Sequence, residues 1–72
     1  MDLSKFSPLL ITCTIDPFGN LNVAHRNSIE GTVHRQVLSP SDTEVFDPVA
    51  RERVPIAVHL AGKIPLGWPP RP

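Results

Sequence analysis

The sequence predicts a mainly β fold, a small antiparallel sheet or barrel-like body of about four short strands. Four stretches alternate apolar with polar residues, as strands with one buried face do. Clusters of Gly, Pro, Asn and Asp separate these stretches and are typical of turns. The C-terminal end is too rich in proline for a helix or an inner strand. We therefore expect a β-rich body over residues 1–62 and an extended Pro-rich arm over residues 63–72.

The first element expected is a β-hairpin over residues 9–26. Side chains in residues 9–15 alternate between two faces, which indicates a half-buried strand. One face carries Leu9, Ile11, Cys13 and Ile15, and the other carries Leu10, Thr12 and Thr14. Residues 16–20 supply a turn, because their proline presets φ and their Gly-Asn pair can adopt positive φ. Alternation then resumes over residues 21–25.

A third strand is expected over residues 32–38, after a turn at residues 27–31. Arg35 shares a face with two valines, which favours an edge strand or a paired guanidinium. Residues 39–53 are expected to be a polar connection with one or two helical turns, or a loop. Its Ser-Pro and Asp-Pro steps resemble an N-cap followed by proline at the first helical position.

The last strand is expected over residues 54–60, where valine, isoleucine and leucine recur at every second position. Gly62 ends it, and the arm follows. Four of the last eight residues are proline, and the arm carries the only tryptophan. Apolar side chains alternate along it, so an extended arm would present one apolar edge to another surface. The residues expected to bind a partner are Ile64, Leu66 and Trp68, with Leu3 and Phe6 as a second set.

The size of the chain favours association. A body of about sixty residues rarely supplies more than about 3–5 kcal/mol of stability, and a single cysteine allows no internal disulfide. Seven basic residues balance seven acidic ones, so net charge gives no long-range attraction to nucleic acid or to an anionic membrane. The N-terminus lacks the features of a signal peptide. We expect a cytoplasmic or virion protein with protein partners, in a homo-oligomer or a larger multi-subunit assembly.

No catalytic, cofactor or metal signature is found. Cys13, His25, His34 and His59 fall on different expected strands, and none makes a close-spaced ligand pair of the kind that zinc sites use. Cys13 lies on an apolar face without the electropositive setting that a thiolate needs. We therefore expect no metal, no cofactor and no enzymatic activity.

One short repeat carries a second hypothesis. The dipeptide His-Arg occurs as His25-Arg26 and as His34-Arg35. A hairpin closed at residues 27–31 would bring the two copies near one another, and together they would make a basic patch for a phosphate or an acidic partner.

The function expected first is that of a small structural or interaction protein that docks by its sheet face and its arm. In style, a small neutral β-rich chain with a Pro-rich arm resembles accessory proteins of viral capsids and tails. This resemblance implies a virion component. The alternative is a small binding module or inhibitor that uses the His-Arg patch on nucleic acid or an acidic protein.

Overall fold

The computed structural model describes residues 9–70 of the chain, and the fold is mainly β. Three antiparallel strands form one sheet in the order β1-β2-β3. Their bounds are β1 (Leu9–Ile15), β2 (Leu21–Asn27) and β3 (Thr32–Leu38). This sheet confirms the expected hairpin at residues 9–26 and the expected third strand.

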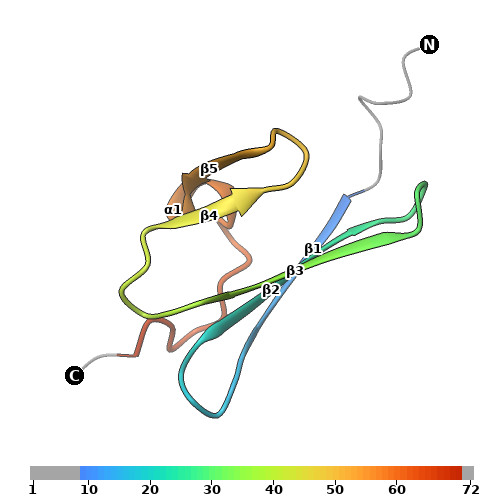
Figure 1. Cartoon of the computed structure of the whole chain (residues 1–72). Coiled ribbons are helices and arrows are strands. Elements are labelled where there is room, and N and C mark those ends of the chain that lie inside the picture. The colour runs from blue at the N-terminus through green and yellow to red at the C-terminus, as the bar shows by residue number, and fades with distance from the viewer. Residues whose placement is uncertain (1–8, 71–72) are drawn as a thin grey trace.

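A smaller second layer follows in the chain. It consists of a two-stranded antiparallel sheet and a helix of one turn: β4 (Glu44–Asp47), β5 (Glu52–Pro55) and α1 (Ile56–His59). Figure 1 shows these three elements grouped to one side of the long three-stranded sheet. The strands of residues 9–70 form no closed barrel, so the barrel-like alternative is wrong. Among the described residues, no helix is long and apolar enough to cross a membrane.

The β1–β2 turn is organised by the side chain of Asp16. Its Oδ1 accepts hydrogen bonds from the backbone N–H groups of Phe18 (2.9 Å) and Asn20 (3.0 Å), and its Oδ2 accepts one from Nδ2 of Asn22 (3.1 Å). These bonds favour the ionised carboxylate, so the pKa of Asp16 lies below its ordinary value, with the Asn20 backbone as the largest cause. Gly19 has a φ of 83° and supplies the left-handed step.

The expected polar connection over residues 39–53 instead contains a β-hairpin. At its start, the Ser39 N–H donates to the carboxylate of Asp42, and the Asp42 N–H donates back to the Ser39 carbonyl. This closes a turn where a helix start was expected. Asp47 likewise begins the β4–β5 turn. The error has a physical cause, because the short polar side chains that cap helices also organise turns.

The prediction of a strand over residues 54–60 is wrong beyond Pro55, where β5 ends. From Ile56 the chain makes one helical turn, closed by a hydrogen bond from the Leu60 N–H to the Ile56 carbonyl (2.9 Å). Ile56 and Leu60 are buried, whereas Val58 is 74% exposed. Residues spaced four apart share a face in a strand and in a helix, so Ile56 and Leu60 fit both, whereas Val58 fits only the strand.

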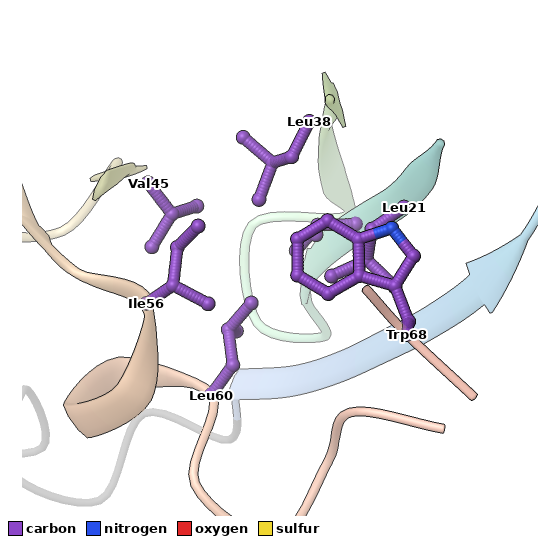
Figure 2. Close-up of a cluster of buried hydrophobic side chains, with 7 residues drawn as sticks. Leu21, Leu38, Val45, Ile56, Leu60 and Trp68 are labelled. Atoms are coloured by element: carbon purple, nitrogen blue, oxygen red, sulfur yellow. The ribbon is translucent and has the colours of Figure 1, made fainter. Parts of the chain in front are cut away.

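The core lies between the three-stranded sheet and the second layer. Its buried apolar residues are Leu21, Val23, Leu38, Val45, Ile56, Leu60 and Trp68. Figure 2 shows the Trp68 indole beside Leu21 on one side of this cluster, with Val45 and Ile56 on the other. The cluster joins strands of both sheets, the helix and the Pro-rich segment, so each part depends on the others for burial.

One side chain connects the two sheets by hydrogen bonds. The amide of Gln36, on β3, donates from Nε2 to the carbonyl of Phe46 on β4 (2.6 Å) and accepts at Oε1 from the Phe46 N–H (3.0 Å). Gln36 thus satisfies backbone groups on the side of β4 that has no neighbouring strand, and it holds the second layer at β3.

Candidate interaction surface

The three-stranded sheet has two faces that differ in what covers them. Residues directly opposite one another on paired strands share a face, so the register assigns each side chain. We call one side the outer face. It consists of Leu10, Thr12 and Thr14 on β1, Asn22, Ala24 and Arg26 on β2, and Val33, Arg35 and Val37 on β3. The opposite side, which carries the core residues Leu21, Val23 and Leu38, is the inner face.

The covering elements of the described chain pack on the inner face. Val45, Ile56 and Leu60 join the core there, whereas the outer face keeps apolar side chains in solvent. Leu10 is 60% exposed, Val37 61% and Val33 43%. The outer face is therefore a sheet surface with exposed aliphatic side chains on both of its edge strands.

A shallow groove of about 580 Å³ runs over this surface. Its lining includes Thr12, Thr14, Asn22, Ala24, Arg26 and Arg35. Arg35 stands opposite Ala24, and Arg26 opposite Val33, so the two guanidinium groups are diagonal neighbours on one face. No strand residue of the outer face is acidic, and the one carboxylate on the groove belongs to Asp16 in the turn. The groove is thus mildly apolar and positively charged.

The structure does not bring the four residues of the predicted His-Arg patch together. His25 and His34 stand opposite one another on the inner face, and His25 is only 2% exposed. Arg26 and Arg35 project from the outer face, because consecutive residues of a strand point to opposite sides. The repeat therefore places two histidines on one side of the sheet and two arginines on the other.

The residues of the Pro-rich arm that were predicted to bind a partner differ in how far they are exposed. Trp68 is 8% exposed, and its indole N–H donates to the Gly19 carbonyl (3.0 Å), so this side chain lies in the core of its own chain. Ile64 is half-buried against the same core, and Leu66 is fully exposed. The second predicted set, Leu3 and Phe6, lies outside the described residues.

Reasoning from the sequence missed two features. It assigned Leu10, Thr12 and Thr14 to one face of the first strand but had no means of telling that this face would stay uncovered. It also missed a contact between the layers, in which Nε2 of His25 lies 2.9 Å from Nε2 of His59. Burial, and next the nearby His59, lower the pKa of His25 below its ordinary value.

The remaining chemistry of the described residues is limited. They include no group of three His, Cys, Asp or Glu side chains that could hold a metal ion. Cys13 is half-buried and unpaired by any disulfide. Burial raises the pKa of its thiol, against a smaller lowering by Lys63, so little reactive thiolate forms near neutral pH.

No protein-family model, curated protein or solved structure matches the chain. What the outer face does is therefore inferred from its own shape and chemistry.

Proposed function

We propose that this chain is a small structural or interaction protein that works inside a larger multi-subunit assembly and docks through the outer face of its three-stranded sheet. The observation that supports the proposal is the exposure of Leu10, Val33 and Val37 on one open sheet face. Arg26 lies between Leu10 and Val33 across the strands, and Arg35 lies between Val33 and Val37 along β3, so the face combines aliphatic and arginine side chains as protein interfaces commonly do. Covering it would also add burial that a short chain needs for stability.

The partner that fits this face is a protein surface with aliphatic side chains and carboxylates. Arg26 and Arg35 would meet acidic groups of the partner, while Val33 and Val37 would pack on apolar ones. Two copies docked face to face would instead bring together two faces of the same positive charge. The proposal therefore favours a different protein as the occupant of the outer face, within whatever multi-subunit assembly the chain joins.

Two further contacts are available for docking. In the described chain, β1 and β3 each pair on one side only, so a partner strand could add to either edge. Leu66 is fully exposed in the Pro-rich segment and could extend the contact. That the assembly is a virion, and that the chain is not an enzyme, stay predictions from the sequence.

The binding-module alternative depended on one patch of four residues. Only Arg26 and Arg35 share a face, and both belong to the outer face already described. An acidic protein partner, which that alternative expected, is therefore already part of the present proposal. No separate observation favours nucleic acid.

The proposal is tested by placing a charge on the outer face. Val37→Asp should release the chain from its assembly, because a carboxylate would be buried against the partner. A tagged copy is expressed in the cells from which the sequence comes, and the lysate is fractionated by size. The unchanged chain should elute far above its own 7.9 kDa, and Val37→Asp at the free chain mass.

Val58→Asp is the matched control, since Val58 is 74% exposed and lies on α1, away from the outer face. It should leave the elution unchanged. Circular dichroism should show all variants folded. Arg35→Glu should also release the chain, while Arg35→Lys should not. An unchanged chain that elutes at the free mass, or a Val37→Asp chain that stays in the large fraction, would overturn the proposal.

A further inference from the structure

A pair of histidines joins the two layers of the molecule. His25 lies on β2 in the three-stranded sheet, and His59 lies on α1 in the second layer. Their Nε2 atoms are 2.9 Å apart, their ring centres 5.2 Å, and their planes are inclined by 23°. Since the ring centres are much farther apart than the nitrogens, the rings meet edge to edge. This is the geometry of an N–H···N hydrogen bond, which needs one protonated and one bare nitrogen.

The surroundings indicate which ring donates. A carboxylate oxygen of Asp47 lies 3.9 Å from Nδ1 of His59, so the hydrogen of neutral His59 is favoured at Nδ1. Nε2 of His59 then carries a lone pair and accepts from the Nε2–H of His25. Nδ1 of His25 is buried and has no hydrogen-bond partner within residues 9–70. In this arrangement Nδ1 of His25 carries a lone pair, and a buried acceptor without a partner costs less free energy than a buried N–H without one.

A metal ion does not fit this pair. Zinc binds imidazole nitrogen at about 2.0–2.1 Å in a tetrahedral arrangement, so a shared ion would hold the two nitrogens about 3.3 Å apart. The observed separation is shorter, and the described residues offer no three-ligand group. The contact therefore holds a proton.

We propose that His25 and His59 form an acid-sensitive latch, which holds β4, β5 and α1 on the three-stranded sheet at neutral pH and weakens that attachment in acid. When both rings are protonated, each Nε2 carries a hydrogen and each ring a positive charge. The 2.9 Å between the two nitrogens leaves room for only one hydrogen between them. The hydrogen bond is then lost and replaced by repulsion.

The groups around the latch act in the same direction. The ring of His34 on β3 lies 6.4 Å from that of His25 and adds a smaller lowering of the pKa of His25. Among the described residues, Asp47 on β4 is the carboxylate that lies nearest the pair, and it lies at the far side of His59. On β1, the residue opposite His25 is the uncharged Ile11.

The sign of the pH dependence follows from His25. Its pKa in the folded chain is lowered from the ordinary 6.5, first by burial and then by His59. The unfolded or opened chain therefore binds more protons than the closed one. The latch contributes its full stability above about pH 6.5 and loses it as the pH falls from there toward the lowered pKa of the folded state.

The first test is nuclear magnetic resonance of the full chain labelled with ¹⁵N. At about pH 7.5, one Nε2 of the pair should be protonated and the other bare, with a scalar coupling between them through the hydrogen bond. On acidification the coupling should vanish as both nitrogens become protonated. Absence of the coupling at neutral pH, or two histidines that both titrate independently at their ordinary pKa, would overturn the latch.

The second test compares unfolding at about pH 7.5 and about pH 5. His59→Gln keeps a polar group at the contact but cannot gain a charge, and His34→Gln is the control beside it. The unchanged chain should lose the most stability on acidification, His34→Gln somewhat less and His59→Gln the least, because His59 lowers the pKa of His25 more than His34 does. Part of the loss should remain in His59→Gln, because burial is the largest cause of the lowered pKa. An equal loss in all three would refute the latch, and should His59→Gln not fold, the resonance experiment decides.

Discussion

The β2–β3 and β4–β5 hairpins close through the same backbone turn but end it with different residues. In the first, the Gly31 N–H donates to the Asn27 carbonyl at 2.8 Å, and Gly31 has a φ of 70°. In the second, the Arg51 N–H donates to the Asp47 carbonyl at 2.7 Å, and Arg51 has a φ of 59°. Glycine adopts this left-handed conformation freely, whereas an L side chain is strained in it.

What the two turns share is the side chain at their start. Oδ1 of Asn27 accepts hydrogen bonds from the backbone N–H groups of Ile29 (3.0 Å) and Glu30 (3.1 Å). Oδ1 of Asp47 accepts from the backbone N–H groups at the same two positions of its own turn, Val49 (2.9 Å) and Ala50 (3.3 Å). The comparison teaches that the short polar side chain organises this turn, and that the residue of positive φ is secondary.

The hairpins differ more in how they are held. The strands of the first bury Leu21, Val23, His25 and Leu38, whereas those of the second bury only Val45. The second hairpin relies on contacts made from outside it: the Gln36 amide binds it directly, and the pair of histidines holds α1, which follows β5 in the chain. Its attachment should therefore fail before its turn does.

The largest effect is expected from removing that attachment. Gln36→Ala would leave the N–H and carbonyl of Phe46 without their partner, at a cost of about 2 kcal/mol in the free energy of unfolding. Urea denaturation measures the loss. Hydrogen exchange should show the Phe46 amide exchanging faster, while the amides between β1 and β2 keep their relative protection.

Gln36→Glu is the control for this change. It keeps an acceptor for the Phe46 N–H but sets a second oxygen against the Phe46 carbonyl. Gln36→Glu should therefore lower the free energy of unfolding as Gln36→Ala does, while the Phe46 amide stays protected from hydrogen exchange. If that amide were equally protected in Gln36→Ala, the attachment would not depend on this side chain.

A smaller effect is expected from the residues that start the turns. Asn27→Ala and Asp47→Ala each remove an acceptor of two backbone hydrogen bonds, which should cost about 1 kcal/mol. Asp47→Ala should cost more, because it also removes the carboxylate beside His59. Urea denaturation of both variants checks the order.

Asp47→Asn separates the two roles of that residue. The amide oxygen can still organise the turn, so most of the stability lost in Asp47→Ala should return. If Asp47→Asn were as destabilised as Asp47→Ala, the charge beside His59 would outweigh the turn, and the parallel with Asn27 would fail.

The same contrast explains how far the fold could be predicted. Strands β1, β2 and β3 each have seven residues with clear alternation, and glycine marks two of their turns. Strands β4 and β5 have four residues each, too few to establish a period. Arg51 gives no sign of positive φ, and the Asp-Pro step before it is equally typical of a helix start.

The candidate surface was predictable only in part. Alternation alone separates Leu10, Thr12 and Thr14 from the other side of β1. Which side stays open depends on where β4, β5 and α1 pack, and no local pattern encodes that. His25 and His59 lie 34 positions apart, and the misassigned last strand hid their contact.

The smallest effect, and the one of opposite sign, is expected at the end of the β4–β5 turn. Arg51→Gly should raise the free energy of unfolding by about 0.5 kcal/mol, because relief of the left-handed strain is partly offset by the greater freedom of glycine in the unfolded chain. Thermal and urea denaturation measure the change. The Arg51 side chain is exposed, so little packing is lost with it.

Gly31→Ala is the reciprocal change in the other turn. No atom lies within 4 Å of the added Cβ, so its cost of about 1 kcal/mol would come from the backbone alone. Opposite signs for the two variants would establish that the turns share one geometry and differ in one strained residue. If Arg51→Gly were destabilising by as much as Gly31→Ala, the arginine would have to contribute a contact of its own, and the second turn would not be a strained copy of the first.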